Sequence, residues 1–268
     1  MTLEEITSES IERMCHTLVF CDGGDAVLID TGLGIGDLRS FVKEITQSDV
    51  RVLLTHSHWD HIGAAHQFDN VAIHDRERSN DGRVSIDILS DEFSDRPAQF
   101  TQNYLEQGYE FPDGFDPNSY TIEPIDGVDT LAFGEEVDVG DRTLELVSIP
   151  GHSPGQLAVL DRTSSVCHGA DILEPDVEIF VHFWDSDLDE YRDTIDRLVT
   201  LRDEKAFDTL TTSHGDLLQG DDLSILDDAQ MALERVTNGD APFEVIETNW
   251  GPTRKYSIEG ISVLTKGA

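Results

Sequence analysis

Three histidines and an aspartate lie within six positions of the stretch LLTHSHWDHIG, residues 53–63. They are His56, His58, Asp60 and His61, and an apolar run precedes them directly. With 10 histidines in 268 residues, this pattern arises by accident in roughly one such chain in six hundred. Imidazole and carboxylate groups are common metal ligands, so the stretch predicts a metal site.

Three further polar residues share the position of this cluster, because each follows an apolar strand signal. His152 lies in GHSPG after RTLELVSI, Asp171 lies in GAD after SSVC, and His214 lies in SHG after FDTLTTS. The neighbouring glycines let the backbone turn sharply, and strand-end loops on a rigid scaffold are where sites are commonly built. We therefore predict that these residues join the first cluster.

Five imidazoles and two carboxylates exceed the four ligands of one tetrahedral zinc, and they suit two adjacent ions that share a carboxylate. Neutral imidazole with carboxylate favours zinc, or iron or manganese, over calcium or magnesium. We expect two Zn²⁺ per chain, with iron or manganese as alternatives. Two such cations lower the pKa of a shared water and supply a hydroxide that attacks a carbonyl carbon or a phosphorus.

The elements that must position these ligands follow from the hydrophobic periodicity. Strands are expected within 16–32, at 51–55, at 71–74 and repeatedly after 128, with helices near 36–47, 187–203 and 222–237. This mixture predicts an α/β fold of sheets covered by helices, as a single domain over residues 1–268.

Residues 75–125 interrupt this pattern. They are polar and acidic but hold seven aromatic side chains, which indicates an insertion of loops with short helices. Two interpretations stay open: a surface excursion with a small apolar underside, or a lid over the site.

The charge balance is extreme, with 55 acidic against 18 basic residues and a formal net charge of −37. Acidic residues are spread along the whole chain. This even spread favours a protein of a high-salt cytoplasm, as in halophilic archaea, and disfavours an acidic patch that binds a basic partner. This field opposes nucleic-acid binding. The acidic N-terminal segment lacks signal-peptide features, no stretch reaches membrane-span length, and the three cysteines form no C-x-x-C pair. We expect a cytoplasmic protein that binds neither nucleic acid nor membrane.

The motifs HSHWDH, GHSPG and SHG, with the Asp after a short strand and IDTG at 29–32, together resemble the metallo-β-lactamase superfamily. The resemblance implies an αββα sandwich of two facing mixed β-sheets with helices outside. Carried over by motif, it implies one ion on His56, His58 and His152. A second ion would lie on Asp60, His61 and His214, with Asp171 bridging the two. Asp60 would be the catalytic residue that orients the nucleophile and passes a proton to the leaving group.

GHSPGQLAVLD resembles the glyoxalase II-like and lactonase-like branches, which implies hydrolysis of a small ester, thioester or lactone. Two features depart from those branches: Glu174 stands where the lactonases carry Tyr, and RKYS (254–257) only faintly resembles the glutathione-binding residues. The alternatives are a mononuclear-iron dioxygenase acting on a persulfide, and a non-enzymatic metal-binding module. The oligomeric state stays open, with a homodimer as one candidate.

Several residues near these motifs have two interpretations. For Asp30 in IDTG we favour a hydrogen bond to the metal loop over a cap on the following turn. For Tyr191, on the apolar face of its predicted helix, packing is favoured over an oxyanion-donor role. His182 lies among aromatic residues that line a pocket or belong to the core. For His168, three residues before Asp171, a packed side chain is favoured over a contact with a metal ligand.

Overall fold

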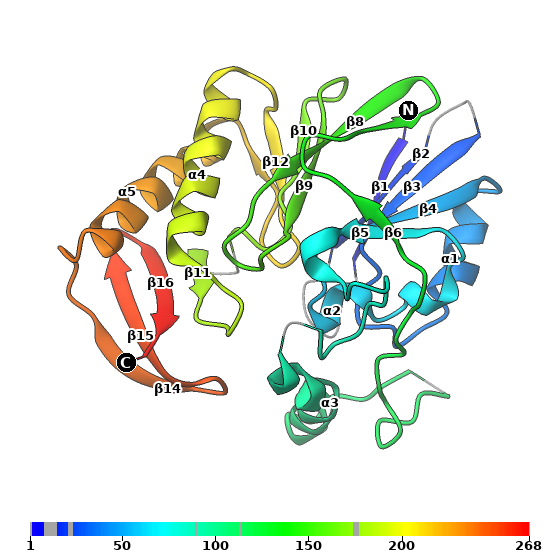
Figure 1. The fold of residues 1–268 in the computed structure, drawn as a ribbon, viewed down its shortest axis with the longest axis horizontal. Helices are drawn as coiled ribbons and strands as arrows, with labels where there is room; N and C mark the ends of the chain where they lie inside the picture. The colour runs from blue at the N-terminus through cyan, green and yellow to red at the C-terminus, as the bar shows by residue number, and fades with distance from the viewer. Residues whose placement is uncertain are drawn as a thin grey trace. The chain divides into compact units, whose positions relative to one another are not determined.

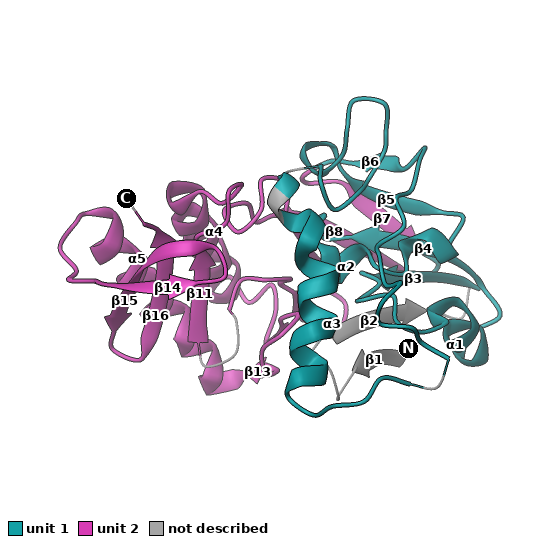
Figure 2. Cartoon of the chain, turned by 90° about the horizontal axis from the view of Figure 1, so that it is seen from below, with its two compact units in different colours: residues 1–132, 139–141 teal, residues 133–138, 142–268 magenta. Residues whose placement is uncertain are grey.

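The computed structural model describes residues 2–7, 15–20, 24–88, 90–112, 114–173 and 177–267. The chain divides into two compact units, which Figure 2 shows in different colours. Unit 1 comprises residues 1–132 and 139–141, and unit 2 comprises residues 133–138 and 142–268. Each unit has its own hydrophobic core. A single domain over the whole chain stays a prediction.

Unit 1 is built on a six-stranded sheet in the order β1-β2-β3-β4-β5-β6. Its strands are β1 (Thr2–Thr7), β2 (Cys15–Phe20), β3 (Asp25–Ile29), β4 (Asp49–Leu54), β5 (Val71–His74) and β6 (Asp129–Leu131). The first three strands pair antiparallel, and β3 to β6 pair parallel. The carboxyl ends of β3, β4 and β5 therefore meet at one edge of the sheet, where α/β proteins place their ligands.

The sequence of β4 explains its central place. Val52, Leu53 and Leu54 are fully buried, as expected for a parallel strand covered on both faces. Helix α1 (Leu38–Ile45) connects β3 to β4 and is capped by Asp37, whose carboxylate accepts a 2.9 Å hydrogen bond from the backbone N–H of Ser40. Helix α2 (Trp59–Ile62) is a single turn that follows β4.

The insertion at 75–125 contains helix α3 (Arg96–Glu106) and short 3₁₀ turns, as predicted. Its aromatic residues pack on one another: the ring centroid of Tyr104 lies 4.8 Å from that of Phe111, and Phe111 lies 4.7 Å from Phe115. The insertion thus has a small cluster of packed aromatic side chains of its own. Its role as a lid stays a prediction.

Unit 2 contains two sheets. The first, in the order β13-β12-β10-β9-β8-β7, holds β7 (Glu136–Val139), β8 (Arg142–Ser148), β9 (Leu157–Asp161), β10 (Val166–His168), β12 (Thr209–Thr211) and β13 (Leu218–Gln219). The second, in the order β11-β16-β15-β14, holds β11 (Glu178–Val181), β14 (Glu244–Thr248), β15 (Gly251–Ile258) and β16 (Ile261–Lys266). The predicted tail strands therefore form a separate sheet, which β11, a strand not foreseen from the sequence, completes by pairing parallel with β16.

Helices α4 (Leu188–Asp203) and α5 (Ile225–Thr237) lie side by side in unit 2 (Figure 1). Buried residues of both helices and both sheets belong to one apolar cluster, including Ile195, Leu233 and Val263. The predicted helices are confirmed. Within the described ranges, no helix has both the length and the apolar character needed to cross a membrane.

Candidate metal centre

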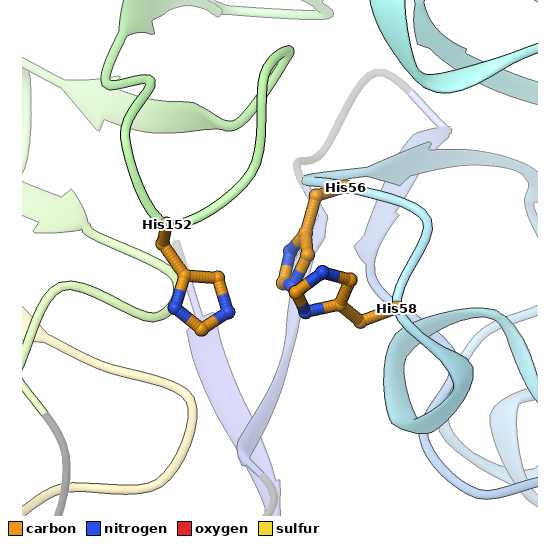
Figure 3. Close-up of side chains that lie close together, drawn as sticks. All are labelled: His56, His58 and His152. Carbon is orange, nitrogen blue, oxygen red and sulfur yellow. The ribbon is translucent and has the colours of Figure 1, made fainter. Parts of the chain in front are cut away.

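Unit 1 gathers the four predicted ligands of the HSHWDH motif at the carboxyl end of β4. His56 and His61 are fully buried, and His58 and Asp60 are buried as well. The His56 ring centroid lies 4.5 Å from that of His58 and 4.0 Å from that of His61. Figure 3 shows the His56 and His58 rings turned toward each other. One ring nitrogen of each lies within 4.8 Å of the other, so both can bind one ion.

The buried carboxylate of Asp30, directly after β3, holds this group. Its Oδ2 accepts a 2.8 Å hydrogen bond from Nδ1 of His61 and another of 2.8 Å from Oγ1 of Thr55. Because the Thr55 hydroxyl proton goes to Asp30, its oxygen accepts from Nδ1 of His56 at 3.0 Å. Both histidines therefore carry the proton on Nδ1 and present Nε2 for a metal. The preferred interpretation of Asp30 is confirmed.

The IDTG segment also supports the ligand loop through its backbone. Both the N–H and the hydroxyl of Thr31 donate to the carbonyl oxygen of His61 at 2.8 Å. The N–H of Gly63 donates to the carbonyl of Gly32 at 2.8 Å, and a Cβ on Gly63 would lie 2.2 Å from the backbone of Leu33. Only glycine permits this close approach at position 63.

A second buried carboxylate, Glu77, was not anticipated from the sequence. It is fully buried, and its Oε2 accepts hydrogen bonds from the backbone N–H of Ser57 at 3.0 Å and from its hydroxyl at 2.7 Å. Ser57 lies between His56 and His58, so this contact fixes the segment that spaces the two ligands. Glu77 follows β5 by three residues, and that strand-end position was the available signal.

Unit 2 brings its three predicted ligands, His152, Asp171 and His214, together as well. All three are buried. Oδ2 of Asp171 lies 3.4 Å from Nε2 of His152 and 3.3 Å from Nε2 of His214. Nδ1 of His152, whose side chain Figure 3 also shows, donates to the carbonyl of Phe180 at 3.3 Å and leaves Nε2 for a ligand. One carboxylate oxygen thus faces two imidazole nitrogens, as a shared ligand would.

Tyr191 on α4 positions both loops of this group. Its hydroxyl donates to the carbonyl of Ile172 and lies 3.4 Å from that of Asp171. Gly151 has φ +126°, and a Cβ there would lie 2.3 Å from Cα of Tyr191, so the loop before His152 packs directly on the helix. The packing interpretation of Tyr191 is confirmed, and its hydroxyl serves the loop that carries Asp171.

His168 and His74 have local hydrogen-bond partners. Nδ1 of His168 lies 2.9 Å from the Thr211 hydroxyl, as expected for a packed histidine. His74 accepts a hydrogen bond from the N–H of Arg76 at 3.2 Å. Burial, and then the charge of Arg76, lower the pKa of His74. His16, Cys15 and Cys21 have side chains outside the described part of the structure.

His182 lies in an aromatic group of unit 2. Its ring centroid is 4.6 Å from that of Phe183, which in turn lies 5.1 Å from His152 and 4.7 Å from Trp250. The aromatic stretch after β11 is therefore adjacent to a predicted ligand, and His182 and Phe183 are buried.

The RKYS segment on β15 is occupied by structural contacts. Nζ of Lys255 pairs with a carboxylate oxygen of Glu178 at 2.9 Å, and the Arg254 guanidinium lies 4.9 Å from the centroid of the Phe243 ring. Glu174, the other departure from the related branches, lies outside the described residues.

Known proteins resemble this chain in sequence and in fold. The human acyl-coenzyme A thioesterase MBLAC2 is 24% identical over 205 residues, covering 70% of this chain and 68% of that protein. The hydroxyacylglutathione hydrolase GloC of Haemophilus influenzae is 24% identical over 178 residues, covering 65% and 72%. A metallo-beta-lactamase family protein from Thermus thermophilus has a similar fold, with TM-score 0.60, 20% identity and coverage of 89% and 80%.

The family match covers all seven predicted ligands. The model of the family described as "Metallo-beta-lactamase superfamily" matches residues 11–214, which is more than half of the chain. The matched span begins before Asp30 and ends at His214. The predicted α/β fold class is confirmed. Buried histidine and aspartate groups able to bind metal ions lie within the matched residues. The chain belongs to the metallo-beta-lactamase superfamily.

Proposed function

We propose that the protein is a binuclear metal-dependent hydrolase of a small ester, thioester or lactone. The observation that carries this proposal is the position of Oδ2 of Asp171, 3.4 Å from Nε2 of His152 and 3.3 Å from Nε2 of His214. A carboxylate oxygen held between two imidazoles is the arrangement expected of a ligand shared by two ions.

The ligands of unit 1 supply what this arrangement lacks. His56 and His58 form one pair, and Asp60 and His61 form another, with Nε2 of His61 3.9 Å from Oδ1 of Asp60. Each pair needs a third ligand to hold an ion, and unit 2 offers one histidine on each side of a shared carboxylate. We therefore infer two ions, one on His56, His58 and His152, the other on Asp60, His61 and His214.

When bound, the two metal ions would supply a hydroxide nucleophile near neutral pH and polarise the substrate carbonyl. The residues of the chain orient the reaction. Asp30 keeps the Nε2 atoms of His56 and His61 free of protons, and the carbonyl of Phe180 does the same for His152. Asp60 has the role of holding the nucleophile's proton and passing it to the leaving group.

A thioester is the favoured substrate among the three classes, because a relative is named an acyl-coenzyme A thioesterase. A soluble small molecule suits the charge of −37 better than a nucleic acid does. The cytoplasmic location, the halophilic origin and the oligomeric state stay predictions.

Metal analysis tests the proposal first. The protein would be purified in concentrated KCl without added metal and analysed by mass spectrometry, then assayed on ester, thioester and lactone panels. About two zinc ions per chain, as ligand count predicts, with turnover that His58→Ala and Asp171→Ala abolish, would support it. His66→Ala, an exposed histidine bonded to the carbonyl of Gly63, is the matched control.

Two results would contradict the proposal. Full hydrolytic activity in His58→Ala and Asp171→Ala would remove the ligands from the mechanism. About one iron per chain with oxygen consumption on a persulfide would indicate the mononuclear dioxygenase instead.

A further inference from the structure

The loop that carries His152 is held by a segment that follows β11. The hydroxyl of Ser186 donates to the carbonyl of His152 at 2.9 Å, and the N–H of Asp187 donates to the carbonyl of Gly151 at 2.8 Å. Ser186 and His152 are both buried. The backbone at this predicted ligand is therefore fixed by two hydrogen bonds from a distant part of the sequence.

The same segment also contacts the imidazole of His152. Its Nδ1 donates to the carbonyl of Phe180, on β11 itself, at 3.3 Å. The ring of Phe183 meets the imidazole edge-on, with 5.1 Å between centroids and 83° between planes. Residues 180–187 thus hold both the backbone and the ring of His152, so the position of its Nε2 depends on where this segment lies.

Lys266, at the end of β16, fixes that segment in turn. Its Nζ donates to the carbonyl of Trp184 at 3.1 Å and to the carbonyl of Ser186 at 2.9 Å. Hydrogen bonds from a charged ammonium group are stronger than those from a neutral donor. β16 also pairs with β11. Strand pairing therefore places the start of the segment, and Lys266 places the turn that follows.

This support comes from the C-terminal sheet. Its strands β14, β15 and β16 all follow residue 214, where the family match ends. We propose that Lys266 and Ser186 are positioning residues for His152, and that the C-terminal sheet thereby sets the affinity of the metal centre. The inference rests on the proposed function for the ion that His152 binds.

Metal affinity tests this role. Lys266→Met removes the ammonium group and keeps an alkyl side chain, and Ser186→Ala removes the hydroxyl. Stepwise dissociation constants for Zn²⁺ would be measured by chelator competition in concentrated KCl. An imidazole that metal binding must first immobilise weakens binding by about 2- to 10-fold, so each variant should raise one of the two constants by that factor. ¹¹³Cd NMR of the Cd²⁺-loaded variants should show one altered signal and one unchanged signal.

A double variant tests whether the two residues act through one path. Once the Ser186 hydroxyl is removed, fixing its backbone no longer holds the carbonyl of His152. The dissociation constant of Lys266→Met/Ser186→Ala should therefore rise by less than the product of the two single increases. Lys266 is exposed, so Lys266→Met should fold even if Ser186→Ala does not, and it then carries the test alone.

Lys255→Met is the matched control. Lys255 lies on β15 of the same sheet, and its Nζ pairs with a carboxylate oxygen of Glu178 on β11 at 2.9 Å. The variant removes the same charge from the same sheet and leaves the hydrogen bonds of Lys266 and Ser186 in place. It should leave the zinc affinity and the ¹¹³Cd spectrum unchanged.

The outcomes separate the two proposals. Wild-type zinc affinity in both Lys266→Met and Ser186→Ala, or an equal loss in Lys255→Met, would overturn the positioning role, whereas the proposed function would still stand on the hydrolysis assays. Single increases that multiply in the double variant would overturn the shared path. Weaker binding in Lys266→Met and Ser186→Ala, without turnover of any ester, thioester or lactone by the wild type, would overturn the proposed function and support the positioning role.

Discussion

Replacement of Asp30 by asparagine should weaken metal binding while preserving the shape of the site. Asp30 is buried and accepts three hydrogen bonds, from the Thr55 N–H at 2.7 Å, the Thr55 hydroxyl at 2.8 Å and Nδ1 of His61 at 2.8 Å. Its φ of +58° is one that asparagine also tolerates. The amide in Asp30→Asn would have one acceptor oxygen in place of two, so one set of donors must lose its acceptor.

Two orientations of the new amide are available, and both carry a cost. If the amide nitrogen faces His61, Nδ1 must become the acceptor and the proton moves to Nε2, where the metal should bind. The Thr55 hydroxyl would then donate to His56 and shift that tautomer too. If the oxygen faces His61, the buried N–H of Thr55 meets another donor and loses its acceptor.

An unpaired buried donor costs about 1–3 kcal/mol. Metal binding requires the orientation in which the amide oxygen faces His61, whereas the metal-free protein adopts whichever orientation has the lower free energy. The cost of the unpaired Thr55 N–H therefore lowers metal affinity by about 5- to 150-fold. Chelator competition in concentrated KCl would measure the affinity, and ¹⁵N NMR of the metal-free protein would report the histidine tautomers.

The control is Asp69→Asn. Asp69 is a surface residue that pairs with Arg39, and the side chain of Asp69 is 84% exposed. It should leave metal affinity unchanged. An Asp30→Asn protein with wild-type affinity, and with the Nε2 atoms of His56 and His61 still unprotonated, would refute the reasoning.

Buried groups elsewhere give three further predictions. Glu77→Ala should lower the free energy of unfolding by about 1–3 kcal/mol, because the Ser57 N–H loses its acceptor; Glu77→Gln, which keeps an acceptor, should lower it less, and equal denaturation midpoints for both variants would contradict this. Burial raises the pKa of Cys167 to about 12, so iodoacetamide at pH 8 should modify it only after unfolding; peptide mapping that finds rapid native labelling would disprove it. Burial alone would raise the pKa of Asp161, but hydrogen bonds from Arg142 and Ser164 outweigh it and lower the pKa. The ionised Asp161 therefore adds to the free energy of unfolding above about pH 4, and this stabilisation is lost as the pH falls through the lowered pKa. In urea titrations, the free energy of unfolding of Asp161→Asn should fall less on acidification than that of the wild type.

The sequence predicted the parts of the site that depend on rare residue types and local order. Histidine is scarce in this chain, so His56, His58 and His61 stand out, and the apolar run before them identifies β4 and its carboxyl end. Asp30 was recognised because it belongs to a short motif after a strand. Each of these inferences uses residues within one strand and the loop that follows it.

The remainder depended on contacts between distant segments. Acidic residues number 55 in this chain, so nothing in composition distinguished Glu77 from a solvated carboxylate until β5 placed it against Ser57. β11 is four residues long and takes its strand pairing from β16, about eighty residues later. The hydrogen bond of the Tyr191 hydroxyl could not be predicted from the helical periodicity. Periodicity indicates which face of a helix is buried, but it does not indicate what a polar atom on that face contacts.

The division of the ligands between the two units bears on protein synthesis. His61 precedes His152 by roughly ninety residues, which a ribosome translates in about 5–20 s. Asp30, Thr55 and Glu77 all belong to unit 1, so the nascent chain already holds the means to orient its first imidazoles. A chain paused in that interval would display two ligand pairs but no Asp171, and would capture metal less firmly than the finished protein. Firm metal binding is therefore expected only after Asp171 and His214 have been synthesised.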